Sequence, residues 1–160
     1  MIAEKSTTFK LANLFGLIAL AIALSGCATP PPSKTFDAHT GKTTVRASPV
    51  IAQDNLFYRL NATPMHTTTA GYGLHTYFST TLGWHFFKQA WSNGKQLKFD
   101  VLDQDVVGSL GVAEEGFIRL SEAEFRKAAK SGFDFKLIGT KGGVEGSVPA
   151  TAFQQVLALK

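Results

Sequence analysis

The dipeptide Asn93-Gly94 stands between two segments rich in strand-forming residues, 84–91 and 97–102. A two-residue hairpin turn of type I′ needs a positive φ at both central positions, and Asn-Gly adopts that conformation readily. In the second segment apolar and polar side chains alternate, which is the pattern of a strand with one buried face. The sequence therefore predicts a β-hairpin here and a fold built around a sheet.

A second hairpin is predicted nearer the C-terminus, where apolar and polar residues alternate over 133–137 and 144–148 on either side of a Gly-rich turn. Pro64 is expected to end an earlier strand, because proline has no N–H to donate to a neighbouring strand. Composition predicts strands at 55–63, 74–82 and 116–120, loops at 65–73 and 106–112, and an edge strand or irregular lead-in at 44–52.

Two short helices are expected after these strands. Ser121 and Glu124 have the spacing of a capping box at the start of the first helix, and Gly132 is suited to end it. Pro149 suits the start of the second helix, which carries an apolar stripe over 153–157. Hairpins followed by helices indicate the α+β class with a mainly antiparallel sheet, and a β-sandwich with peripheral helices is the alternative.

The N-terminal part of the chain contains an apolar run of fourteen residues, Leu11 to Leu24, interrupted by Asn13 and Gly16. A helix needs about 20 apolar residues to span a bilayer, so this run is too short for a membrane span. Its length and its weakly basic flank suit the core of a signal peptide. The run closes three residues before Cys27, the only cysteine in the chain.

The stretch Leu24-Ser25-Gly26-Cys27 resembles the lipobox of bacterial lipoprotein precursors, in which a leucine and two small residues precede the cysteine that becomes lipidated. The resemblance implies a diacylglyceryl group on the sulfur of Cys27 and usually a further acyl chain on its nitrogen, which together hold a protein firmly at a membrane. Ala28 in the next position favours the outer membrane, facing the periplasm. The rest of the chain is similar to small proteobacterial envelope lipoproteins, although no motif carries that likeness.

Three consequences follow for the organisation of the chain. Residues 1–26 are a signal peptide that is removed, so the mature protein has no free thiol for disulfides, metal binding or nucleophilic catalysis. Residues 27–44 include three consecutive prolines and few large apolar side chains, which predicts a lipidated, flexible tether with a reach of roughly 20–50 Å. Residues 45–160 then form a single domain.

The charged residues point to no nucleic-acid partner and no cofactor. The net charge is +4 for the whole chain, and Lys and Arg are dispersed along it. The histidines (His39, His66, His75 and His85) lie at least nine positions apart, without the spacing of a zinc motif.

A partial calcium-loop pattern begins at Asp103 and places Glu114 in its twelfth position. Val107 breaks it, because a fifth-position valine offers no side-chain oxygen. We therefore predict neither a metal site nor a catalytic site.

The preferred hypothesis is a non-catalytic binding or assembly module, attached to the membrane by the lipid on Cys27 and contacting other envelope proteins. A periplasmic hydrolase-like enzyme is the alternative, and a sheet that binds an apolar ligand is a weaker third. Aromatic residues at 84–91 are expected to lie in a sheet covered on both faces, in preference to an exposed patch. The enzyme hypothesis requires convergence of at least two of His66, His75, His85, Asp100, Asp103 and Asp105 in one cleft.

Overall fold

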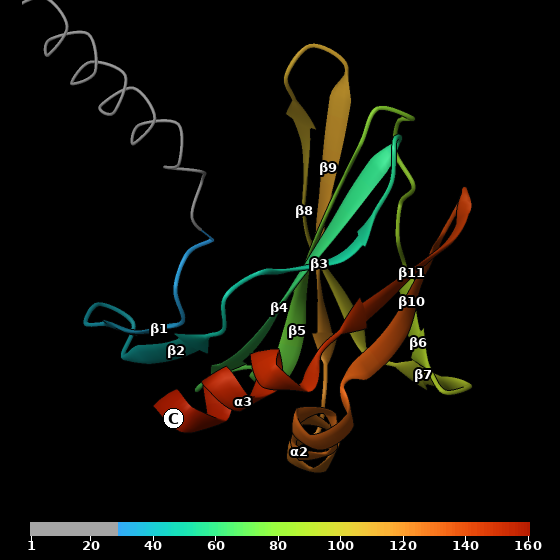
Figure 1. Cartoon of the computed structure of the whole chain (residues 1–160). Coiled ribbons are helices and arrows are strands. Elements are labelled where there is room, and N and C mark those ends of the chain that lie inside the picture. The colour runs from blue at the N-terminus through green and yellow to red at the C-terminus, as the bar shows by residue number, and fades with distance from the viewer. Residues whose placement is uncertain (1–28) are drawn as a thin grey trace, which may run out of the picture.

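The computed structural model describes residues 29–160, so the apolar run, the lipobox and Cys27 lie outside the described residues. Within that range eleven strands form two antiparallel sheets, and two helices follow late in the chain (Figure 1). This arrangement confirms the α+β class. No helix between residues 29 and 160 has the length and apolar character needed to cross a membrane.

The larger sheet has the strand order β1-β2-β4-β5-β9-β8, and β3 also pairs with β4. Its long central strands, β4, β5 and β9, pair over most of their lengths. The strands of this sheet are β1 (Ser33–Asp37), β2 (Lys42–Arg46), β3 (Val50–Asp54), β4 (Tyr58–Thr67), β5 (Gly71–Thr80), β8 (Phe99–Val107) and β9 (Gly111–Arg119).

The smaller sheet has the order β11-β10-β6-β7 and shares one hydrophobic core with the larger sheet and both helices. Figure 1 shows the helices together at one end of the sheets, opposite the turn between β8 and β9. Phe125 and Phe153 join the helices in an edge-to-face contact, with ring centroids 5.0 Å apart. The remaining elements are β6 (Gln89–Ser92), β7 (Lys95–Leu97), β10 (Phe133–Gly139), β11 (Gly142–Val148), α2 (Glu122–Ser131) and α3 (Ala150–Leu159).

The turn at Asn93-Gly94 is present as predicted, with φ angles of 49° and 74°. The strands beside it are shorter than predicted, because residues 84–88 are not in a strand. The alternating segment 97–102 is divided between β7 and β8, which belong to different sheets. Leu97 is buried and Phe99 packs against the same core, but Val101 and Leu102 are exposed, so the alternation does not mark one continuous buried face.

The loop predicted at 65–73 is wrong, and so is the strand end at Pro64. Strand β4 runs through Pro64 to Thr67, and only residues 68–70 form the turn to β5. The Pro64 carbonyl accepts a hydrogen bond from the Ala47 N–H at 2.9 Å. Pro64 therefore faces the gap between β3 and β2, where β4 pairs with neither strand. A residue without an N–H loses no ladder bond there.

The tether predicted over residues 27–44 is wrong from Ser33 onward, because β1 and β2 form a hairpin there. Its turn is fixed by the Asp37 carboxylate, which accepts hydrogen bonds from the N–H groups of His39 and Thr40 and from the Thr40 hydroxyl. The Thr40 hydroxyl and these N–H groups lower the pKa of Asp37. Strand β2 then pairs with β4, so the folded unit begins near residue 33.

The loop predicted at 106–112 is confined to the turn at 108–110, and its other residues belong to β8 and β9. The short strand predicted at 116–120 is the end of the longer strand β9, which closes at Arg119. Strand β8 is the last strand of the larger sheet, and most of its residues are exposed. The Asp103 carboxylate accepts a hydrogen bond from the Gln104 N–H at 2.8 Å, and the Asp105 carboxylate accepts one from the Val106 N–H at 2.7 Å. These two backbone donors are therefore occupied by side chains of their own strand.

Both helices begin where the sequence predicts. In α2 the Ser121 hydroxyl accepts from the Glu124 N–H, and the Glu124 carboxylate accepts from the Ser121 N–H, which is the capping box. The Lys95 ammonium on β7 also bonds to Glu124, and together these contacts lower the pKa of Glu124 to about 2. Gly132 ends α2 with a φ of 79°, and Pro149 caps α3.

Candidate functional site

The structure brings no two of the six residues singled out by the enzyme hypothesis into a hydrogen bond with each other. His66 contacts the Tyr72 ring at a tilted angle on the helix-covered side of the larger sheet, whereas His85 is buried in the segment between β5 and β6. His75 and Asp100 are paired with other residues. Asp103 and Asp105 are exposed on the edge strand β8.

The best-developed polar site lies on the outward face of the larger sheet. The registers Asn61↔Tyr77↔Glu115 and Thr63↔His75 place these side chains in two adjacent rows across β4, β5 and β9. Successive residues of a strand point to opposite faces, so all five point away from the core. A pocket of about 450 Å³ opens here, lined by four of these residues (Asn61, Thr63, His75 and Tyr77) and by Pro30, Pro31, Ser33, Arg46, Ala47, Pro49 and Met65.

Beside this pocket His75 pairs with Glu115, with 2.9 Å between Nε2 and Oε2. Both side chains are about one-third exposed. A carboxylate in this position orients the imidazole ring, as it does in many general bases. Among residues 29–160 no hydroxyl group hydrogen-bonds to His75.

Arg46 gives the same pocket a positive charge. The other arginines of the described region are each paired with a carboxylate: Arg59 with Asp54, Arg119 with Asp100, and Arg126 with Glu122. Arg46 has no such partner within residues 29–160. A guanidinium group offers up to five N–H donors, which suits recognition of a carboxylate or phosphate. The pocket thus combines a free cation with neutral hydrogen-bonding groups and proline walls.

A carboxylate that sequence reasoning assigned no structural role, Glu114, lies on the opposite face of β9. Only 5 % of it is exposed, and its two oxygens accept hydrogen bonds from the backbone N–H groups of His85 (2.5 Å) and Phe87 (3.1 Å). The His85 carbonyl in turn accepts from the Thr140 N–H and hydroxyl on the β10–β11 turn. Glu114 therefore fixes the segment between β5 and β6 and is occupied by backbone donors.

This position for Glu114 leaves the partial calcium pattern without its twelfth ligand. Within residues 29–160 no group of three or more His, Asp, Glu or Cys side chains is arranged to hold a metal ion.

The aromatic segment 84–91 does not form the predicted strand covered on both faces. Phe87 is buried and meets Phe78 edge-to-face at 5.0 Å between ring centroids. Phe86 is exposed and stacks on Trp84 at 6.0 Å. Phe86 also has a positive φ of 50°, which turns consecutive aromatic side chains to different sides of an irregular segment.

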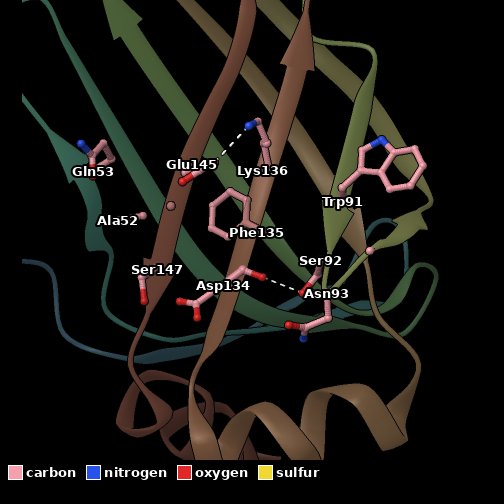
Figure 2. Close-up of a pocket in the computed structure, with 12 residues that line it drawn as sticks. Ala52, Gln53, Trp91, Ser92, Asn93, Asp134, Phe135, Lys136, Glu145 and Ser147 are labelled. Atoms are coloured by element: carbon pink, nitrogen blue, oxygen red, sulfur yellow. Dashed lines mark hydrogen bonds and ion pairs between the residues drawn. The ribbon is translucent and has the colours of Figure 1, made fainter.

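A second pocket, of about 480 Å³, lies across the smaller sheet (Figure 2). Figure 2 shows the ion pair between Lys136 and Glu145, 3.0 Å long, and the bond from the Ser92 hydroxyl to the Asp134 carbonyl, 2.6 Å long. The Trp91 ring points away from these groups. The Lys136 and Glu145 charges neutralise each other, so among the described residues this pocket offers no unpaired arginine like Arg46, and it is the weaker candidate for binding an anion.

Comparison with known proteins adds no homologue to this picture: no family model, no curated protein and no solved structure matches the chain.

Proposed function

We propose that the chain is a non-catalytic binding module of the bacterial envelope, held by lipid on Cys27 at the periplasmic face of the outer membrane. The observation that carries this proposal is the position of Pro30 and Pro31, which follow the lipobox and also line the pocket beside His75. Pro30 is three positions after Cys27 in the sequence, a span of about 10 Å at most. The proposed anchor would therefore hold the pocket close to the membrane.

The chemistry of the pocket supports binding in preference to catalysis. Arg46 is a cation without a carboxylate partner in the described region, and Asn61, Thr63 and Tyr77 add neutral donors and acceptors. These groups suit a polar ligand with a negative charge, such as an acidic segment of an envelope protein. A periplasmic hydrolase remains the second candidate, and it is favoured by one observation, the His75–Glu115 pair.

Lipid attachment is tested by mass spectrometry of the mature N-terminal peptide from cells that express the full chain. We expect a mass increase on Cys27 and membrane fractionation, and both should disappear in Cys27→Ser. An unmodified Cys27 in a protein that fractionates as soluble would remove the basis for the anchor.

Binding is tested by photocrosslinking in cells. Tyr77 is replaced with photoreactive benzoylphenylalanine, and Trp91 on the smaller sheet is replaced in the same way as a matched control. We expect defined adducts from position 77, weakened by Arg46→Ala, and none of these adducts from position 91. Hydrolysis of model esters is measured in parallel for the parent chain and for His75→Ala. If position 77 gives no adduct, and the parent hydrolyses the esters but His75→Ala does not, the enzyme hypothesis is preferred.

A further inference from the structure

The end of the larger sheet opposite the helices carries exposed apolar side chains on neighbouring turns. Leu56 and Phe57, between β3 and β4, are 90 % and 54 % exposed, and Leu110, between β8 and β9, is 83 % exposed. All three line one surface hollow of about 480 Å³, together with polar residues from 54–59 and 79–81. We call residues 55–57 and 108–110 the apical turns. A single exposed leucine is ordinary, but three large exposed apolar side chains around one hollow indicate a contact surface.

Hydrogen bonds fix the backbone of the first apical turn. The Asn55 carboxamide oxygen accepts hydrogen bonds from the N–H groups of Phe57 (2.9 Å) and Tyr58 (3.0 Å). The Phe57 carbonyl accepts from the Thr80 hydroxyl at 2.9 Å and from the Thr81 N–H. Turn tips usually carry small polar residues. Here a rigid turn presents Leu56, so a contact made by this residue costs little further ordering.

We infer that the apical turns insert into the same lipid surface that holds the acyl chains of Cys27; this inference rests on the proposed lipid anchor. Ser33, the first residue of β1, pairs with Arg46 on β2, which pairs with Met65 on β4, seven residues from Tyr58 at the start of β4. At about 3.3 Å per strand residue, β1 begins roughly 23 Å from the apical end of β4.

The six residues from Ser33 back to Cys27 span at most about 22 Å. Strand β1 is antiparallel to β2 and β2 is antiparallel to β4, so β1 runs parallel to β4 and the chain before it heads towards the apical end. Figure 1 shows the segment before β1 running towards the side on which the β8–β9 turn projects. This length of chain is enough to bring the proposed lipid on Cys27 close to the level of the apical turns.

The charges at this end favour an apolar attraction over an electrostatic one. Asp54 and Arg59, which also line the apical hollow, are paired with each other at 2.8 Å. Asp103 and Asp105, on the strand that leads into the second apical turn, are exposed and acidic. Insertion should therefore gain nothing from anionic lipids.

The test places an environment-sensitive fluorophore, NBD, on the apical turns. Acylation of the Cys27 sulfur leaves an introduced cysteine as the only free thiol, so Leu56→Cys is labelled selectively in the full lipidated chain. The protein is reconstituted into phosphatidylcholine vesicles. We expect a blue shift and a rise in NBD emission at position 56. The matched control, Phe36→Cys on β1, is also at a strongly exposed residue and should show neither change.

A negative charge introduced on the second apical turn, residues 108–110, gives a second test of insertion. Leu110→Asp should lower the inserted fraction of the position-56 probe by roughly tenfold or more, because an apolar contact is replaced by a carboxylate. Replacing a quarter of the phosphatidylcholine with anionic lipid should leave the probe unchanged. A blue shift that appears only when other envelope proteins are added would overturn insertion and identify a protein as the occupant.

Mass spectrometry of the same samples separates this inference from the proposed function. Lipid on Cys27 without a blue shift at position 56 overturns insertion and leaves the anchor intact. If Cys27 carries no lipid, the anchor fails, and the labelled double variant Cys27→Ser/Leu56→Cys is added to vesicles. A blue shift in that experiment supports insertion by the apical turns alone, and no shift refutes it.

Discussion

The buried carboxylate of Glu114 offers the sharpest test of how this fold is held together. It accepts hydrogen bonds from the backbone N–H groups of His85 and Phe87, and no cation pairs with it among residues 29–160. Two effects oppose each other at such a site. Hydrogen bonds to a charged acceptor contribute about 1.5–3 kcal/mol each, whereas burial of an unpaired charge costs several kcal/mol.

We expect the hydrogen bonds to outweigh the burial cost, because the fold supplies both donors without further rearrangement. Glu114→Gln has nearly the same volume but offers one acceptor oxygen, so it leaves one buried N–H facing an NH₂ group. The expected loss in the free energy of unfolding is about 2–3 kcal/mol. For a folded region of this size, that corresponds to a fall in Tm of roughly 8–12 °C. Glu114→Ala removes both acceptors and should cost about 3–5 kcal/mol.

The measurement is urea unfolding followed by tryptophan fluorescence, together with hydrogen exchange at the amides of His85 and Phe87. Glu115→Gln is the control, because Glu115 is the next residue of β9 but points outward to His75. Glu115→Gln should change the free energy of unfolding by no more than about 1 kcal/mol. A Glu114→Gln protein as stable as the parent, with both amides still protected, would refute the reasoning and show that charge burial cancels the bonds.

Other positions give independent checks of the same structure. Ser121→Ala removes the cap of α2 and should lower the free energy of unfolding by about 1 kcal/mol, and Ser121→Asn should restore most of it in thermal melts. Burial, and secondarily Lys160, lower the pKa of His66. Protonation of His66 is therefore easier in the unfolded chain than in the folded one. The contribution of neutral His66 to the free energy of unfolding is present above about pH 6.5 and is lost as the pH falls through the pKa of the folded state. The urea midpoint should drop between pH 7.5 and 5.5, and less so in His66→Gln. Gly73→Ala would place a Cβ 2.5 Å from the Ile118 carbonyl oxygen, and we expect a loss of about 1–3 kcal/mol by the same urea titration.

The sequence predicted those turns and helix ends that depend on residues only a few positions apart. The Asn93-Gly94 turn and the Ser121–Glu124 capping box depend only on neighbouring backbone, and both are confirmed. The continuation of β4 through Pro64 depends on a gap between two partner strands, which no local pattern reveals. The β1–β2 hairpin was missed because threonine-rich strands show little hydrophobic alternation, although the Asp37–Thr40 turn was a usable signal.

The candidate site was less accessible to sequence reasoning than the fold. His75 was a candidate from the start, but its partner Glu115 is forty residues away and is brought to it by the pairing of β5 with β9. The adjacent carboxylate, Glu114, points to the other face because side chains alternate along a strand. Glu115 and Glu114 are neighbours in the sequence, yet the first lies beside the pocket and the second stabilises the core. Which of them faces the pocket depends on the strand register, and this register is fixed only in the assembled sheet.

The last strand of the larger sheet bears on how copies of the chain meet at high concentration. A bare strand edge would let copies join edge to edge into ribbons. Asp103 and Asp105 already occupy the N–H groups of Gln104 and Val106, so an incoming strand finds fewer donors and two acidic side chains. Replacing both residues with alanine would free these donors and remove the charges. The doubly substituted chain should therefore polymerise through β8 at concentrations at which the parent stays dispersed.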